Sequence, residues 1–314
     1  MNIQYLSMWG KNREKTWSGT NYSLYKALNK KIQVSDIGFR LKFIEKLFIK
    51  LYSLSFNDDK VLGFFNNLNY LSTAIPSIHA SRKLKHINYD SVVLQIGDIK
   101  KTNKPYYLYQ DLSIDSLLYI KEMNPTAFKY SGFVNIPDKA LKKRSRIQNN
   151  IYHDASGIFT MSKWLAKDLV ENSMVPREKV HHVGGGFNVD LKNVKVMERK
   201  KNKILFVGRD FKRKSGDLTY QAFKILSEKY MDDAELYIAG PSENPLVENN
   251  SKVTYLGDLS KERLSYYYNI CDIFCMPSYF EAYGLVFGEA LVYGLPCIGR
   301  NNFAMKEFIQ YRLN

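Results

Sequence analysis

Residues 281–289 read Glu-Ala-Tyr-Gly-Leu-Val-Phe-Gly-Glu. They follow a short apolar segment at 273–276, which predicts a strand, and they open a helix expected over 285–293. Glu281 and Glu289 therefore bracket a helix N-terminus, where free backbone N–H groups and the helix dipole suit a phosphate. A carboxylate inside such a helix can accept hydrogen bonds from sugar hydroxyls. The stretch indicates a nucleotide-sugar site; the alternative is an acidic first turn that only complements the dipole.

Apolar and amphipathic segments alternate on both sides of this stretch. The second half predicts strands at 204–207, 235–239, 253–256, 273–276 and 296–298, and helices at 217–230, 261–269 and 285–293. The first half predicts strands at 2–8, 91–96, 106–109, 156–161 and 179–183, and helices at 22–28 and 163–171. This alternation favours an α/β fold with parallel sheets and helices on both faces. A charged stretch at 190–203 is the expected linker, so we predict two Rossmann-like domains, 1–195 and 196–314.

A basic loop follows the first strand of the second half. Between Gly208 and Asp217, Arg209 and Lys214 begin and end a run of six residues that holds four cations. Ligands of open α/β sheets bind at the carboxyl ends of the strands, and a guanidinium can grip a diphosphate through two parallel bonds. The loop favours diphosphate binding, with a basic turn in solvent as the alternative.

These two motifs together resemble those of a known family. Residues 277–296 follow the string Pro-Ser-x-x-Glu-Ala-Tyr-Gly-Leu-x-x-x-Glu-Ala-x-x-x-Gly-x-Pro. It is similar to the signature of the retaining nucleotide-sugar glycosyltransferases of family 4, which have two Rossmann-like domains (the GT-B fold). The basic loop resembles the family's Gly-Arg-(x)4-Lys-Gly string, although Ser215 stands where the family usually has Gly. The resemblance covers about residues 150–310; the first 150 residues match only in layout.

The resemblance implies roles for single residues. Arg209 and Lys214 would hold the donor diphosphate, together with the helix start at Gly284 and Leu285. Glu281 would face the sugar. The remaining donor contact, Glu289, would hold the ribose hydroxyls.

Two further candidates lie in the first half. Gly19, in the loop Ser18-Gly19-Thr20, resembles a small-residue loop that approaches the donor phosphate; the alternative is a helix cap by Ser18 or Thr20. Asp111 stands where relatives place a His or Asp near the reacting centre, which makes it the candidate that orients or deprotonates the acceptor. Its alternative is a turn residue at a strand end.

The net charge of +15 lies entirely in the first half, where residues 1–200 carry 32 Lys and Arg against 17 Asp and Glu. This asymmetry indicates an anionic partner, such as a membrane surface or an acidic glycan, or only a solvated basic surface. Residues 39–52 combine an apolar stripe with a row of lysines, as helices that lie in a membrane interface do. We interpret the segment instead as a surface helix packed on its own core. Residues 139–146 read as a basic loop, which is either a second candidate contact for an anion or a plain solvated loop.

Other classes of protein are disfavoured by what the sequence lacks. No signature of a nucleic-acid-binding motif is present, so we expect no nucleic-acid partner. The five histidines lack ligand spacing and an Asp-x-Asp motif is absent, so we expect neither a metal nor another cofactor. No apolar run is long enough to span a bilayer, and residues 1–15 do not read as a signal peptide. Cysteines at 271, 275 and 297 fit a reducing compartment, so we expect a cytoplasmic protein, with docking at the inner face of the membrane as an option.

The chain ends at Asn314, soon after residues 303–309, which resemble the family's Pro-Glu-Ile loop. Family members continue with another strand and helices, so we expect an incomplete second domain with an uncovered sheet edge. The motifs favour a glycosyltransferase that moves a sugar from a nucleoside diphosphate sugar to a hydroxyl of a glycan or lipid-linked acceptor. The alternative is a non-catalytic nucleotide-sugar-binding module that needs a partner; another GT-B activity, such as an epimerase or phosphorylase, fits the spacing less well.

Overall fold

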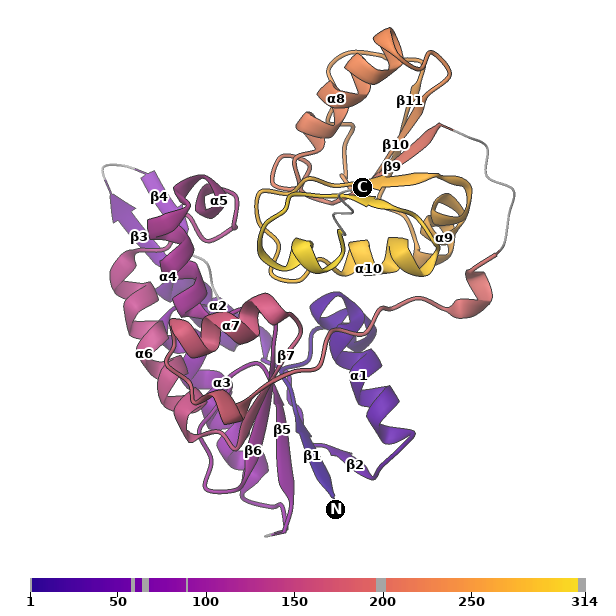
Figure 1. The fold of residues 1–314 in the computed structure, drawn as a ribbon. Coiled ribbons are helices and arrows are strands. Elements are labelled where there is room, and N and C mark those ends of the chain that lie inside the picture. The colour runs from indigo at the N-terminus through magenta and orange to yellow at the C-terminus, as the bar shows by residue number, and fades with distance from the viewer. Residues whose placement is uncertain (1, 58–59, 64–67, 89, 196–201, 310–314) are drawn as a thin grey trace. The chain divides into compact units, whose positions relative to one another are not determined.

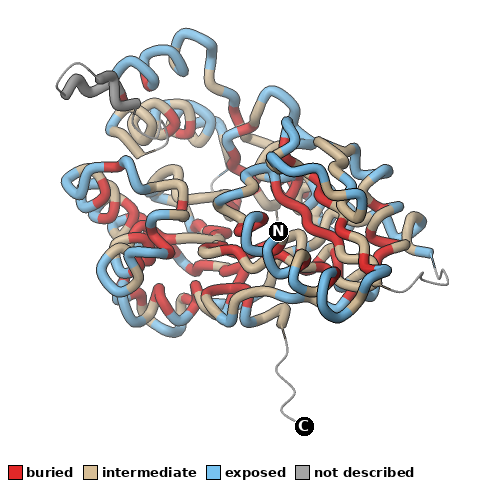
Figure 2. The backbone as a smooth tube through the Cα atoms, turned by 90° about the horizontal axis from the view of Figure 1, so that it is seen from above, coloured by how far each residue is buried: buried red, intermediate tan, exposed pale blue. Residues whose placement is uncertain are grey.

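The computed structural model describes residues 2–57, 60–63, 68–88, 90–195 and 202–309. It divides into two compact units, Met1–Gly186 (unit 1) and Phe187–Asn314 (unit 2), each with its own sheet and core. Buried residues run along the strands and the inner faces of the helices, while exposed residues lie on outer turns and loops (Figure 2).

Unit 1 is built on a six-stranded parallel sheet in the order β2-β1-β5-β6-β7-β8 (Figure 1). Its strands are β1 Ile3–Leu6, β2 Val34–Asp36, β5 Val92–Ile96, β6 Tyr106–Gln110, β7 Gly157–Thr160 and β8 Val180–His182. Its helices are α1 Thr20–Asn29, α2 Phe43–Tyr52, α3 Tyr70–Leu84, α4 Ile114–Met123, α5 Pro125–Lys129, α6 Asp138–Asp154 and α7 Lys163–Glu171. A separate antiparallel hairpin joins β3 Leu54–Asn57 to β4 Lys60–Gly63. Short 3-10 helices lie at Arg13–Gly19 and Arg177–Lys179.

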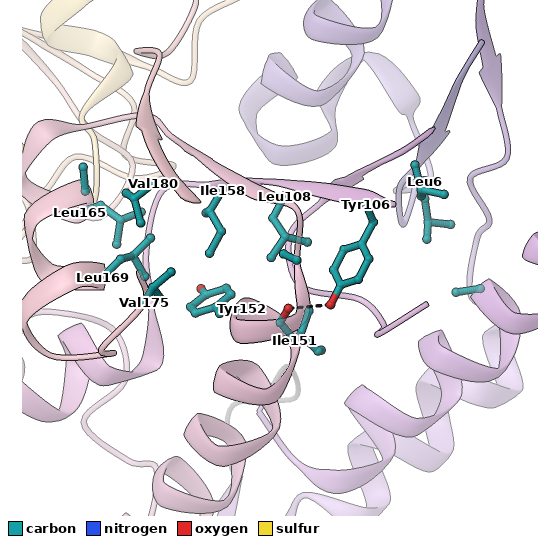
Figure 3. Packing of buried hydrophobic residues seen from close by; sticks show 14 of the residues in the cluster. Leu6, Tyr106, Leu108, Ile151, Tyr152, Ile158, Leu165, Leu169, Val175 and Val180 are labelled. Atoms are coloured by element: carbon teal, nitrogen blue, oxygen red, sulfur yellow. Dashed lines mark hydrogen bonds between the residues drawn. The ribbon is translucent and has the colours of Figure 1, made fainter. Parts of the chain in front are cut away.

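Successive strand residues point to opposite faces of this sheet, so each of the central strands β1, β5, β6 and β7 supplies two cores. On one face, Leu108 and Ile158 pack against residues of α3, α6 and α7 (Figure 3). Tyr106 of β6 anchors α6 there, because its hydroxyl donates a 2.7 Å hydrogen bond to the Ile151 carbonyl. On the other face, Tyr5 and Leu94 pack against α1.

Unit 2 is built on a five-stranded parallel sheet in the order β11-β10-β9-β12-β13. Its strands are β9 Lys203–Val207, β10 Glu235–Ala239, β11 Val253–Gly257, β12 Ile273–Cys275 and β13 Cys297–Ile298. Its helices are α8 Gly216–Lys229, α9 Lys261–Ile270 and α10 Leu285–Val292, with 3-10 helices at Leu191–Asn193 and Phe303–Glu307.

Helices cover both faces of this second sheet as well. Phe274 of β12 meets Phe287 of α10 edge to face at 5.3 Å, whereas the next residue, Cys275, faces Thr219 of α8 with Sγ 3.9 Å from Oγ1. The prediction of two parallel sheets flanked by helices is therefore confirmed.

The boundary between the units lies earlier than the predicted division at 195/196. Unit 2 begins at Phe187, whose ring stacks on Tyr283 at 6.5 Å. The side chain of Asn269 accepts a 2.9 Å bond from the Lys195 amide and donates a 2.8 Å bond to the Asn193 carbonyl. These contacts bind the start of the charged stretch to unit 2, so composition alone placed the boundary too late. The rest of the expected linker, 196–201, and the chain end at 310–314 lie outside the described residues.

Two readings of basic segments in unit 1 are wrong. Residues 139–146 are not a loop but the first turns of α6. The helix expected within 39–52 exists as α2, but it does not pack its apolar stripe on the core: Ile44, Phe48 and Leu51 are all more than half exposed. The only buried residue of α2 is Ile49, on a different face.

Candidate functional site

The loops after β9 and β12 are neighbours at the carboxyl edge of the unit 2 sheet. From β9 the chain moves outward through β10 to β11, then returns to place β12 on the other side of β9. The strand order therefore reverses between β9 and β12, and ligands of open α/β sheets bind at such a switch point. The loop after β9 holds the predicted diphosphate-binding cations, and the loop after β12 leads into Glu281.

An ion pair joins these two loops. The Lys214 ammonium donates a hydrogen bond to Oε1 of Glu281, with only 15% and 8% of the two side chains exposed. Desolvation lowers the pKa of Lys214, and the charge of Glu281 opposes this shift. Gly208 makes room for the lysine stem, because a Cβ added there would lie 2.9 Å from Cγ of Lys214. The fold thus brings together two of the residues that the sequence placed at the donor.

The backbone at Ser215 explains why the family string usually has glycine at this position. It adopts φ 57° and ψ 40° in the turn that starts α8, a left-handed conformation that glycine adopts without strain. A glycine is therefore the natural residue at this position.

The start of α10 lies directly after Glu281. Gly284 is its N-cap in the left-handed region, φ 91°, and no side chain caps the helix. The first amide groups of α10, beginning at Leu285, can therefore turn to an anionic ligand. Arg300 braces the preceding loop: its Nε donates a 2.8 Å bond to the Pro277 carbonyl, and its guanidinium lies 4.0 Å from the centre of the Tyr279 ring. Sequence reasoning missed this arginine, which lies beyond the motif.

The other two donor candidates of unit 2 have partners of their own. Arg209 is 79% exposed, and its Nη2 lies 3.3 Å from Oδ1 of Asp258. Burial raises the pKa of Glu289, and the charge of Lys261 and the hydroxyl of Tyr268 oppose this shift. Neither Asp258 nor Tyr268 was predicted, because both come from other segments of the chain.

In unit 1 the structure joins the two sequence candidates through a tryptophan. Trp17 Nε1 donates to Oδ2 of Asp111 at 3.3 Å, and its ring meets Tyr109 edge to face at 5.9 Å. Burial raises the pKa of Asp111 to about 6, against the lowering effect of the Trp17 bond. The loop after β1 thus reaches the end of β6. The signal that could have found Trp17 is its place in the same loop as Gly19.

The loop that carries Gly19 is strained. Trp17, Ser18 and Gly19 have φ values of 50°, 56° and 89°, three successive left-handed residues of which two are not glycine. Such strain gathers at functional sites. Gly19 is the N-cap of α1 and no side chain caps that helix, so the alternative of a cap by Ser18 or Thr20 is wrong.

Among the described residues, no group of three or more His, Cys, Asp or Glu side chains could hold a metal ion. The expectation of a metal-independent reaction stays a prediction. Within the part of the chain that the structure describes, no helix has both the length and the apolar character needed to cross a membrane.

Comparisons with known proteins relate the chain to glycosyltransferases. Residues 190–312 match the family described as Glycosyl transferases group 1. A 41.2 kDa protein of the cps region of Klebsiella pneumoniae, itself uncharacterized, is 34% identical over 120 residues, which are 37% of this chain and 32% of that protein. An uncharacterized glycosyltransferase of Methanocaldococcus jannaschii is 25% identical over 219 residues, 62% of this chain and 55% of the relative. The chain therefore matches less than two thirds of the length of these curated relatives.

Solved structures show the same fold. Sucrose-phosphate synthase from Thermosynechococcus elongatus superposes with a TM-score of 0.66 at 14% identity, covering 98% of this chain and 82% of the synthase. WaaG, a glycosyltransferase involved in lipopolysaccharide biosynthesis, gives 0.63 at 13% identity and covers 98% and 83%. The fold is that of GT-B glycosyltransferases.

Proposed function

We propose that the chain is a glycosyltransferase of the family 4 type. It moves a sugar from a nucleoside diphosphate sugar to a hydroxyl of a glycan or lipid-linked acceptor, with retention at the anomeric carbon. The observation that carries the proposal is the buried Lys214–Glu281 pair at the switch point of unit 2, beside the start of α10. The match of residues 190–312 to group 1 glycosyltransferases supports it.

The chemical problem is the leaving group. As the bond between the anomeric carbon and the diphosphate oxygen breaks, its electron pair moves to that oxygen. Lys214 and the amide groups at Gly284 and Leu285 are the charges and dipoles that stabilise it in a desolvated site. Arg209 supplies a second cation once it exchanges Asp258 for phosphate oxygens, and its high exposure leaves it free to do so.

The sugar and the ribose need acceptors of hydrogen bonds. Glu281 would accept hydrogen bonds from the sugar hydroxyls once the diphosphate replaces it as the partner of Lys214. The ion pair in the free protein therefore holds both side chains in place for the donor. Both side chains are desolvated. In the absence of donor, the ion pair therefore keeps Lys214 and Glu281 from being unpaired buried charges. Glu289 would hold the ribose hydroxyls.

Unit 1 would serve the acceptor. Asp111 would take the proton of the acceptor hydroxyl. The oxygen of that hydroxyl would bond to the anomeric carbon on the face that the diphosphate leaves. Gly19, in the strained loop, would approach the donor phosphate, as the family resemblance implies. The basic character of the first half favours an acceptor at an anionic membrane surface on the cytoplasmic side.

A thermal-shift screen against UDP, GDP, ADP and their sugar conjugates tests the donor site. One nucleotide should raise the melting temperature of the protein, since a ligand that binds only the folded state stabilises it. Lys214→Ala should abolish the shift. Lys212→Ala is the matched control, because Lys212 is an exposed cation of the same loop. A shift of equal size in Lys214→Ala, or no shift with any nucleotide, would overturn the proposed site.

Turnover separates an enzyme from a non-catalytic binding module. Release of nucleoside diphosphate from the bound nucleotide sugar should occur with wild type and fall about 100-fold or more in Glu281→Gln, because removal of one electrostatic contact in a desolvated site commonly has that effect. The variant should still bind the free nucleoside diphosphate. Binding without turnover, with lipid-linked and soluble glycan acceptors both supplied, would favour the module.

A further inference from the structure

A pocket of about 330 Å³ lies within unit 1, between the end of α2 and the beginnings of α3 and α6. Its walls are mostly apolar and include Tyr52, Leu68, Ile136 and Ile147. Its volume lies at the lower end of the range for small-molecule sites. None of the candidate donor or acceptor residues lines it, so the sugar-transfer proposal leaves this pocket unexplained.

Three cations stand at this apolar pocket: Lys139, Lys143 and Arg144. Arg144 is 11% exposed and pairs with Asp98 through Nη2, while its buried Nη1 has no partner among the described residues. The Lys143 ammonium lies 4.8 Å from the centre of the Tyr70 ring, and Lys139 forms no ion pair with any residue that the structure describes.

The helix that carries these cations begins at Pro137, an N-cap that makes no side-chain cap. Five Lys or Arg residues lie in its first half, Asp138 to Arg146, and its first turn holds both Lys139 and the acidic Asp138, which pairs with Lys121. Positive charges at a helix N-terminus oppose the helix dipole, and uncapped amide groups there attract anions. A phosphate at this end of α6 would meet both the uncapped amide groups and the lysines.

The pocket continues into an exposed apolar surface on α2. Tyr52, the last residue of α2, lines the pocket, and Ile44, Leu47, Phe48 and Leu51 occupy positions i, i+3, i+4 and i+7 of the same helix. These four residues, here called the α2 stripe, are between 38% and 55% exposed. Exposed apolar side chains gathered on one helix face mark a candidate interaction surface.

Polar contacts hold α2 so that this stripe faces outward. Glu45 bonds His79 of α3 at 2.8 Å, and the Asn69 side chain donates a 2.9 Å bond to the Ile49 carbonyl. Lys46 and Lys50 lie one turn apart on the helix, beside the stripe. An apolar stripe bordered by lysines is the pattern of a helix that lies in a membrane interface.

We infer that the α2 stripe and the pocket together bind the surface of an anionic membrane. The stripe enters the interface, an acyl chain of one anionic lipid occupies the pocket, and the phosphate of that lipid is held by Lys139, Lys143 and the start of α6. Apolar walls with three cations among the lining residues match the two parts of such a lipid. The inference rests on the proposed function, which places the acceptor at an anionic membrane surface. The donor site of unit 2 takes no part in it.

Vesicle flotation of the whole protein tests the surface. It should bind phosphatidylglycerol-containing vesicles at low salt, bind pure phosphatidylcholine vesicles weakly, and lose affinity as salt rises. Phe48→Ser/Leu51→Ser should reduce binding about tenfold or more. Tyr230→Ser/Val247→Ser is the matched control, because these residues are 77% and 102% exposed but lie in unit 2.

A pair of charge reversals tests the headgroup site. Lys139→Glu/Lys143→Glu should weaken binding about tenfold or more, since each cation near an anionic surface contributes about fivefold in affinity. The control Lys163→Glu/Lys167→Glu reverses two exposed lysines at the same spacing, again from the first turn of a helix. An equal loss in both pairs would show that net charge alone drives binding and would overturn the headgroup site.

The pocket is tested apart from the bilayer. Monomeric short-chain phosphatidylglycerol should raise the melting temperature of wild type, and Ala140→Phe, which fills the pocket from α6, should abolish that shift. Absence of both vesicle binding and this shift would overturn the inference. So would a dimer in solution that Phe48→Ser/Leu51→Ser dissociates, because the stripe would then be a protein interface. The nucleotide-induced shift, measured on the same variants, should persist throughout, so failure here is distinguishable from failure of the donor site.

Discussion

Single residues of the donor site carry strain that substitution can reveal. Ser215 holds a left-handed conformation, and its hydroxyl is buried without a partner among the described residues. Ser215→Gly should therefore raise the free energy of unfolding by about 0.5–1 kcal/mol, because the strain lost exceeds the added freedom of the unfolded chain. Urea denaturation checks this. Thr219→Gly, within the same helix, should instead destabilise; a loss of stability in both variants would contradict the argument.

The Lys214–Glu281 pair should be strongly coupled in stability as well as in binding. Removing one partner leaves a desolvated charge alone, so Glu281→Leu should cost about 3 kcal/mol of the free energy of unfolding. The double variant Lys214→Met/Glu281→Leu should cost less than that single change. Denaturant titration of the two single variants and the double variant measures the coupling. Additive losses would show that the pair is solvated rather than buried.

Asp111 should set the acid limb of activity. Its pKa of about 6 in the folded protein lies above the ordinary aspartate value, so the carboxylate needed to take the acceptor proton forms only as pH rises through about 6. The transfer rate should rise across that interval. Trp17→Phe removes the bond that lowers this pKa, so the midpoint should move upward. An unchanged midpoint in Asp111→Asn would show that another group titrates.

The same raised pKa has a consequence for stability. Between about pH 4 and 6 the folded protein holds the Asp111 proton more tightly than the unfolded chain does, so this group favours folding at low pH and its contribution is lost as pH rises through about 6. The Asp111→Asn substitution should therefore remove a pH-dependent part of the unfolding free energy.

At the scale of elements, α10 depends on a close contact at Gly288. A Cβ added there would lie 1.7 Å from Cε1 of Phe187, whose ring stacks on Tyr283. Gly288→Ala should therefore displace that ring and cost about 1–3 kcal/mol of stability, although alanine is the better helix former. The second substitution Phe187→Leu in the Gly288→Ala background should recover part of the loss in thermal unfolding. No recovery would mean that the clash is resolved elsewhere.

Helices α2 and α6 show the limit of periodicity. The pattern of residues 39–52 correctly indicated an amphipathic helix, but it could not say whether the apolar stripe meets protein, because that depends on which face α3 covers. Glu45 and Ile49, not the stripe, make the contacts between α2 and the rest of unit 1. The basic residues 139–146 read as a loop because lysines and arginines carry little apolar periodicity. Their helix is held instead by Leu141, Gln148 and Ile151 on its inner face.

The molecule as a whole should unfold in two steps. Each unit has its own sheet and its own buried core, so calorimetry of the full chain should resolve two transitions. A nucleoside diphosphate should shift only the transition of unit 2, by about 2.7 kcal/mol of stabilisation at a hundredfold excess over its dissociation constant. Lys214→Ala should remove that shift and leave the other transition in place. A single transition that moves as one would show that the two units unfold together.

Much of this protein follows from local patterns. Alternation of apolar segments predicted the strands and helices of unit 2 to within a residue or two, because short buried parallel strands and amphipathic helices are encoded in neighbouring residues. The family resemblance of the two loop motifs implied Lys214 and Glu281 as donor residues, and the fold brings them together because the loops after β9 and β12 lie at one edge of the sheet. Contacts between distant segments could not be predicted from the sequence. They are the hydrogen bond from Trp17 to Asp111, the hydrogen bond from Arg300 to the Pro277 carbonyl, and the packing of residues 187–195 in unit 2. Each depends on three-dimensional packing, which brings together side chains whose sequence separation carries no local signal.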